Sequence, residues 1–197
     1  MAPKPSSPTA GTDPVSENSG AAAQGFIGHH DLTIDDKLRI TVPSKFKAVL
    51  QNMQNSNGSG PITVIATIGL QSEFPSILVF SPDQWEEYIG EFDGSPVFDK
   101  EKQAVQRLST AVANVCDLDS HGRIRLDKRL VELAMIDKQV TAVGCRKHFE
   151  LWDSGRFNLF VRNTSGSLDS LLEKIRGQKD AKGPAPDGQS IATTTAQ

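Results

Sequence analysis

Apolar residues in the middle of the chain come in short runs, which polar or Gly/Pro-containing segments separate. Runs such as residues 62–68 (ITVIATI) and 76–80 (SILVF) are rich in β-branched and aromatic residues, which favours strands over helices. The strands predicted from this pattern span residues 30–34, 39–42, 62–68, 76–80, 115–118, 123–126, 139–143 and 149–152.

Helical spacing marks several of the intervening segments. In residues 100–112, Val105, Leu108 and Val112 fall on one face of a helix. The predicted helices cover residues 44–50, 100–112, 127–133 and 168–175, with another that begins at Pro82 after a Ser81 cap and a final turn capped by Asp153. This mixture of short strands and helices predicts an α+β fold.

The chain repeats one pattern imperfectly. Residues 34–42 (IDDKLRITV) return as residues 118–126 (LDSHGRIRL), each with Asp-x-x-x-Arg before a short β-prone run. We therefore expect two copies of one unit in a pseudo-symmetric fold, each with the order strand, turn, strand, helix, strand, strand, helix. Within each copy we expect the two strands that flank the turn to pair as a β-hairpin.

The Asp-x-x-x-Arg turn is a pattern that can hold its arginine in a fixed position. An Asp at the start of a turn accepts backbone N–H bonds and fixes the loop, so the Arg four residues later is held in one place. Paired basic side chains on a rigid β-ribbon can enter a groove of duplex DNA. An ion pair that only ties the turn is an equally good interpretation of a single copy. Recurrence in both copies, each with further cations, favours a functional surface.

The ends of the chain differ in composition from its middle. Residues 1–25 and 177–197 are rich in Pro, Ser, Gly and Ala and contain few large apolar residues, so we expect both to be disordered. The start lacks the apolar core of a secretory signal, and no stretch reaches the roughly 18 apolar residues of a membrane span. We therefore expect a soluble, cytoplasmic protein.

The net charge and the absence of known catalytic motifs limit the classes of function that the sequence supports. The chain has 21 basic and 24 acidic residues, a net charge of −3, which argues mildly against non-specific binding of nucleic acid. Its basic residues nevertheless gather on the two repeated turns. Neither a P-loop nor a dinucleotide-binding or nucleophile-elbow motif occurs, so no enzyme is expected. His29, His30, His121 and Cys116 lack the spacing of metal ligands, and no metal or cofactor is predicted.

Six motifs, in order, resemble those of the MraZ family, whose members are pairs of fused SpoVT-AbrB-type modules. They are residues 26–28 (FIG), 34–43 (IDDKLRITVP), 82–85 (PDQW), 105–108 (VQRL), 116–123 (CDLDSHGR) and 147–153 (KHFELWD). Any one motif is weak evidence, but the ordered set is specific and spans essentially the whole folded core.

The resemblance implies an α+β fold, a pseudo-two-fold swapped-hairpin β-barrel of two fused SpoVT-AbrB repeats with flanking helices and disordered tails. The repeats would cover residues 29–84 and 113–156, with a helical connector at 85–112 and a C-terminal helix at 157–176. The implied function is a sequence-specific DNA-binding transcriptional regulator that represses its own division and cell-wall operon. It would bind direct repeats in promoter DNA as a homo-oligomeric ring, in the cytoplasm and associated with the nucleoid.

The same resemblance assigns roles to the repeated turns. The arginines would contact a phosphate or a guanine edge of double-stranded DNA. A residue between the Asp and the Arg of each motif would contact a further phosphate, and the aspartates would shape the loops. The expected DNA-binding residues are Lys37, Arg39, His121 and Arg123, and the loop-shaping residues are Asp35 and Asp119.

Two positions depart from the family pattern. Leu38 replaces the Gly that usually precedes the first Arg, and because Leu adopts positive φ only at a cost, we expect a reshaped first loop. Asp127 replaces a Pro that would correspond to Pro43. Together with the slightly acidic charge balance, these departures leave one alternative: a ring-forming interaction protein that has lost specific DNA binding.

Overall fold

The computed structural model describes residues 25–54, 60–69, 73–92 and 99–181. Most of both predicted tails therefore lies outside the described residues. The strands are β1 (His29–Thr33), β2 (Arg39–Thr41), β3 (Thr63–Ile68), β4 (Ile77–Phe80), β5 (Asn114–Asp117), β6 (Arg123–Arg125), β7 (Gln139–Gly144) and β8 (Phe149–Asp153). The helices are α1 (Ser44–Gln54), α2 (Pro82–Gly90), α3 (Lys100–Ala111), α4 (Lys128–Leu133), α5 (Ser154–Ser165) and α6 (Leu168–Ala181). Every strand predicted from the sequence has a counterpart here.

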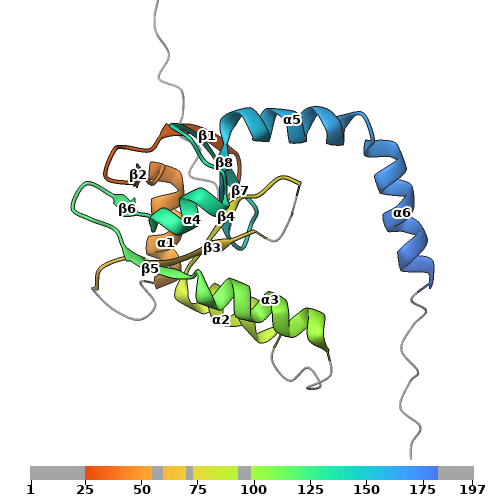
Figure 1. The fold of residues 1–197 in the computed structure, drawn as a ribbon, viewed down its shortest axis with the longest axis horizontal. Helices are drawn as coiled ribbons and strands as arrows, with labels where there is room; N and C mark the ends of the chain where they lie inside the picture. Colours follow the sequence, from red (N-terminus) through yellow and green to blue (C-terminus); the bar gives the residue numbers. More distant parts are fainter. Residues whose placement is uncertain (1–24, 55–59, 70–72, 93–98, 182–197) are drawn as a thin grey trace, which may run out of the picture.

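The strands form an antiparallel sheet of six, in the order β1-β7-β8-β4-β3-β5, and a separate ribbon of β2 with β6 (Figure 1). Four of the pairings, β1 with β7, β2 with β6, β3 with β5 and β4 with β8, join the first repeat to the second. Only β3 with β4 and β7 with β8 pair inside one repeat. Both repeats thus contribute strands to the sheet and to the ribbon, and form a single structure.

The local hairpin predicted around each Asp-x-x-x-Arg turn is wrong. The strand before each turn pairs in the six-stranded sheet, whereas the strand after it pairs in the ribbon. A unit of this size buries too little apolar surface alone, and exchange of partners lets both units share one core. Strands β1 and β5 are the edges of the six-stranded sheet, so these pairings do not show the closed barrel that was expected.

The core lies where the sheet, the ribbon and helices α1 and α4 meet (Figure 1). Three fully buried rings, of Phe26, Phe46 and Phe149, have centroids 5.2 to 5.5 Å apart, within the range of favourable aromatic contact. Ile40 and Ile124 are opposite each other at the centre of the ribbon and are also buried. The inner face of the ribbon therefore packs against the core.

Side-chain caps begin four of the helices, as the sequence pattern indicated for α2. The Oγ of Ser81 accepts the backbone N–H of Gln84 at 3.4 Å. Asp127 caps α4, because its Oδ1 accepts the N–H groups of Arg129 at 2.8 Å and Leu130 at 3.4 Å. The aspartate that departs from the family pattern thus has a structural role that Pro, which lacks these acceptor oxygens, would not supply.

The C-terminal part of the structure is longer and more helical than the sequence predicted. The turn expected after Asp153 is the start of α5, and the single helix expected at 157–176 is two helices, of which α6 continues to Ala181. Figure 1 shows α6 standing away from the sheet. Among the described residues, none of the helices has the length and apolar content needed to span a membrane.

Candidate nucleic-acid interface

The first Asp-x-x-x-Arg loop is fixed by its aspartate. Oδ1 of Asp35 accepts the backbone N–H groups of Lys37 and Arg39, each at 2.9 Å. Oδ2 accepts the Nε–H of Arg39 at 2.7 Å and pairs with its Nη2 at 2.6 Å. Two backbone bonds, from Leu38 to the Asp35 carbonyl and from Asp35 to the Arg39 carbonyl, complete the loop. The guanidinium is thereby held in one orientation.

The second loop repeats this arrangement bond for bond. Oδ1 of Asp119 accepts the N–H groups of His121 at 2.8 Å and Arg123 at 3.0 Å. Oδ2 accepts the Nε–H of Arg123 at 2.8 Å and lies 2.7 Å from its Nη2. The backbone bonds of Gly122 and Asp119 match those of the first loop. The recurrence seen in the sequence is therefore a recurrence of geometry.

Leu38 does not reshape the first loop, contrary to the expectation from sequence. It has a φ of 58°, close to the 72° of Gly122 at the equivalent position. Its half-buried side chain packs against the hydrophobic core, which offsets the cost of the left-handed conformation. The second loop instead has a lysine beside its glycine, since a Cβ on Gly122 would lie 3.6 Å from the Cδ and Nζ atoms of Lys47.

The ribbon places both loops on one surface. The carbonyls of Leu38 and Gly122 each accept a backbone N–H from the opposite chain segment, at 2.9 Å. Because side chains alternate along a strand, the residues beside the buried Ile40 and Ile124 point outward. The facing pairs on this outer side are Arg39 with Arg125 and Thr41 with Arg123.

Electrostatic coupling keeps both aspartates ionised. The hydrogen bond from Arg39 lowers the pKa of Asp35 to about 2, and that from Arg123 lowers the pKa of Asp119 to about 2, with backbone N–H groups of each loop acting in the same direction. The pKa of Arg39 is raised, mainly by its hydrogen bond to Asp35 and also by the charge of Asp119. The two loops are thus close enough to influence each other electrostatically.

A family comparison covers both loops. A sequence model of the family described as "MraZ protein, putative antitoxin-like" matches residues 26–108 and 110–174, so each match contains one Asp-x-x-x-Arg loop. The chain belongs to the MraZ family.

Relatives within the MraZ family match most of the chain. It is 30% identical over 150 residues to a protein from Moorella thermoacetica, covering 76% of this chain and 96% of that protein. It is 27% identical to one from Alkaliphilus metalliredigens, with the same coverage. A protein from Saccharophagus degradans is 32% identical over 127 residues, which are 64% of this chain and 81% of that protein. Each of the three is named "Transcriptional regulator MraZ".

In this member of the MraZ family, the six residues assigned from the motifs all lie on the two loops. Lys37 is exposed at the tip of the first loop. His121 is exposed in the second, with Nδ1 3.2 Å from the Oγ of Ser120 and 3.5 Å from Nη2 of Arg123. Arg125 and Lys47 join this surface but are absent from the assigned set. The alternation of outward residues after each motif would have pointed to Arg125, whereas only the fold brings Lys47 next to Gly122.

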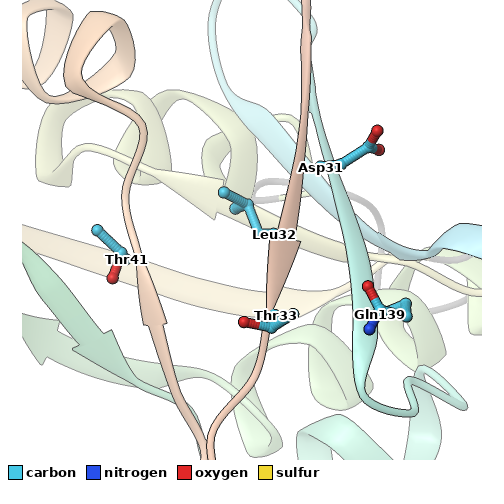
Figure 2. A pocket seen from close by; sticks show the side chains of 5 residues that line it. All are labelled: Asp31, Leu32, Thr33, Thr41 and Gln139. Carbon is cyan, nitrogen blue, oxygen red and sulfur yellow. The ribbon is translucent and has the colours of Figure 1, made fainter.

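A pocket beside the ribbon differs from the loops in the charge of its lining residues. Figure 2 shows its lining residues, which are Thr41 on β2, Leu32 and Thr33 on β1, and Asp31 and Gln139 on the β7 side of β1. The only charged group among them is the Asp31 carboxylate, whose Oδ1 accepts the Thr141 hydroxyl at 3.1 Å. A lining whose one charged group is a carboxylate does not suit a phosphate, so this pocket is not part of the proposed basic surface.

Proposed function

We propose that this protein is a transcriptional regulator that binds double-stranded DNA through the outer face of the β2–β6 ribbon and its two loops. The observation that carries the proposal is the pair of identically bonded loops, which hold Arg39 and Arg123 on one antiparallel ribbon. Rigid presentation of arginines at fixed separation suits groove recognition, because little side-chain entropy remains to be lost on binding. The relatives named as transcriptional regulators support the same assignment.

The proposed roles follow from the donors that the loops leave free. Arg has five N–H donors, and each motif arginine uses its Nε and one Nη2 hydrogen on its own aspartate. The remaining donors of Arg39 and Arg123 would contact a phosphate or a guanine edge. Lys37 and His121 would contact phosphates, with Arg125 as a further cation on the same face.

Self-association is the second part of the proposal. Six apolar side chains on α5 and α6 are between 38% and 55% exposed, and the four on α6 follow the i, i+3, i+4, i+7 spacing of one helix face. An exposed apolar stripe of this kind is typical of a protein interface. The residues are Leu159, Val161, Leu168, Leu171, Leu172 and Ile175.

We further propose that the protein assembles as a homo-oligomeric ring of swapped-hairpin units. The ring would bind promoter direct repeats and repress the protein's own division and cell-wall operon, in the cytoplasm and at the nucleoid. Several modest basic surfaces on one oligomer would then act together on one DNA molecule, which compensates for the net charge of −3. Such a regulator would not be an enzyme.

One alternative has support in the same loops. The charge of each motif arginine is balanced by its own aspartate, and the chain as a whole is slightly acidic. A diverged family member could therefore keep the ring and bind a protein in place of specific DNA.

Fluorescence anisotropy would separate these functions. The labelled probe is the duplex from upstream of this protein's own gene, titrated at two salt concentrations beside a scrambled duplex. The variant is Arg39→Ala with Arg123→Ala, and the control is Lys102→Ala with Arg107→Ala on α3, which removes the same charge elsewhere. Specific, salt-sensitive binding that only the first variant loses supports the regulator. Equal weak binding to both duplexes by all three proteins supports the interaction protein.

A further inference from the structure

The tip of the β7–β8 hairpin brings together three different metal-ligand side chains. Cys145, His148 and Glu150 each offer one ligand atom, and all three atoms lie within 4.8 Å of one another. They come from a Cys-x-x-His-x-Glu sequence, in which the first two residues bracket the turn and the third is on β8. The proposed function does not use these three residues, although His148 and Glu150 lie within the 147–153 motif.

The turn fixes the cysteine relative to the histidine. The backbone N–H of Cys145 donates to the His148 carbonyl at 2.9 Å, and Arg146 has a positive φ of 64°. Two further 2.9 Å bonds tie Arg146 to Phe26, whose ring is in the core. Gly144 accommodates that close approach, because a Cβ there would lie 2.5 Å from the backbone of residues 26 and 27.

Neighbouring side chains orient two of the three proposed ligands, Glu150 and His148. Oε2 of Glu150 accepts the indole N–H of Trp152 at 2.7 Å, while Oε1 lies 3.4 Å from Nε2 of His148. The His148 ring packs on the Phe80 ring, with centroids 4.8 Å apart. The Trp152 hydrogen bond is an outer contact of the kind that holds metal ligands in place.

We propose that Cys145, His148 and Glu150 bind a zinc ion, with a water molecule as the fourth ligand. Thiolate, imidazole and carboxylate are the side chains that Zn²⁺ takes in proteins. With bonds of about 2.0 to 2.3 Å in a tetrahedron, the ligand atoms would be roughly 3.3 to 3.8 Å apart, so a modest inward movement completes the site. The exposed hairpin tip leaves the fourth position open to solvent.

The metal-free state is consistent with this geometry. Without an ion, the Cys145 thiol donates to the Val143 carbonyl at 3.9 Å. Zinc binding would displace the thiol proton into solvent, form the Zn–S bond and let the carboxylate turn to the metal.

The place of the site in the fold indicates what zinc would do. Just before β7, the Lys138 carbonyl accepts the backbone N–H of Ile34, which precedes the first arginine loop. The hairpin tip is at the other end of β7. A zinc ion at the tip would therefore cross-link the end of the hairpin. It would also hold Phe26 in place through the backbone bonds between Phe26 and Arg146, and it would not contact DNA. The site stands independently of the proposed DNA binding.

The test uses the full chain, kept reduced, with Co²⁺ as a spectroscopic probe and Zn²⁺ as its competitor. We expect one ion per chain, a thiolate-to-cobalt absorption band, and a higher unfolding temperature with zinc. Cys145→Ser should abolish the band, and His148→Ala and Glu150→Gln should each weaken Zn²⁺ at least about tenfold. Cys116→Ala and His29→Ala are the matched controls and should bind as the wild type does. Absence of the cobalt band in the wild type, or undiminished Zn²⁺ affinity in Cys145→Ser and His148→Ala, would overturn the proposal.

Discussion

Leu38 and Gly122 adopt the same left-handed conformation at equivalent positions of the two arginine loops, and the carbonyl of each accepts a bond from the opposite side of the ribbon. The backbone requirement is thus identical in both repeats, while the side chains differ. A leucine is stable there because it reaches the core, whereas the glycine leaves room for Lys47.

This relationship predicts that the free energy of unfolding responds differently to substitution at the two positions. Gly122→Ala should lower the free energy of unfolding by about 1 kcal/mol, because an L-residue is strained at a φ of 72°. Leu38→Gly should change it by no more than about 1 kcal/mol, because relief of strain offsets lost packing. Urea denaturation measures both. Gly90→Ala, a site with open space around the glycine, is the control and should not destabilise the protein. An unchanged midpoint for Gly122→Ala would contradict the assignment of strain.

The loop aspartates predict a defined acid sensitivity. The pKa values of Asp35 and Asp119 are lowered to about 2 from 3.8 in the folded protein. Lowered pKa values contribute stability that is fully present above about pH 4 and is lost as the pH falls towards 2. Urea midpoints measured across this window should therefore fall less steeply for the Asp35→Asn, Asp119→Asn double variant than for the wild type. The neighbouring Asp36→Asn change is the control, and an identical slope in all three proteins would argue against the loop ion pairs.

Arg125 offers a sharper test of the DNA surface than the motif arginines do. It faces Arg39 across the ribbon, and no carboxylate pairs with it among the described residues. If it contacts a phosphate, Arg125→Ala should weaken binding about tenfold and reduce the slope of log K against log salt by about 0.9. Anisotropy titrations at several salt concentrations give both quantities. Lys102→Ala should leave the slope unchanged, and a wild-type slope for Arg125→Ala would remove this residue from the interface.

Asp127 has a cap role that mutagenesis can isolate. Because Oδ1 accepts two N–H groups at the start of α4, Asp127→Ala should cost about 1 kcal/mol of unfolding free energy. Asp127→Asn keeps an acceptor oxygen and should cost much less. Thermal or urea unfolding distinguishes them, and equal losses for the two variants would mean that the carboxylate acts through its charge and not as a cap.

The sequence predicted the strands well because strand patterns are local, but it could not predict their partners. Residues on either side of Asp35 show the alternation of a hairpin, yet nothing local indicates that β1 pairs with β7 and β2 with β6. The loop residues could be assigned because an Asp-x-x-x-Arg turn is defined by its own contacts. Lys47 could not, since only the fold brings α1 to the second loop. No metal was predicted from the sequence, because Cys145, His148 and Glu150 come together only in the geometry of the hairpin.

The apolar stripe on α6 predicts how the protein self-associates. Leu168, Leu171, Leu172 and Ile175 are exposed on a helix that stands away from the sheet (Figure 1), so burying them in an oligomer would remove a large apolar surface from water. Leu171→Glu with Ile175→Glu should shift the mass measured by light scattering towards the monomer. Glu173→Ala with Lys174→Ala on the same helix should not. DNA affinity should fall with the oligomer mass, because each subunit alone presents only one modest basic surface. If the mass of the Leu171→Glu, Ile175→Glu variant equals that of the wild type, the subunits associate through another surface.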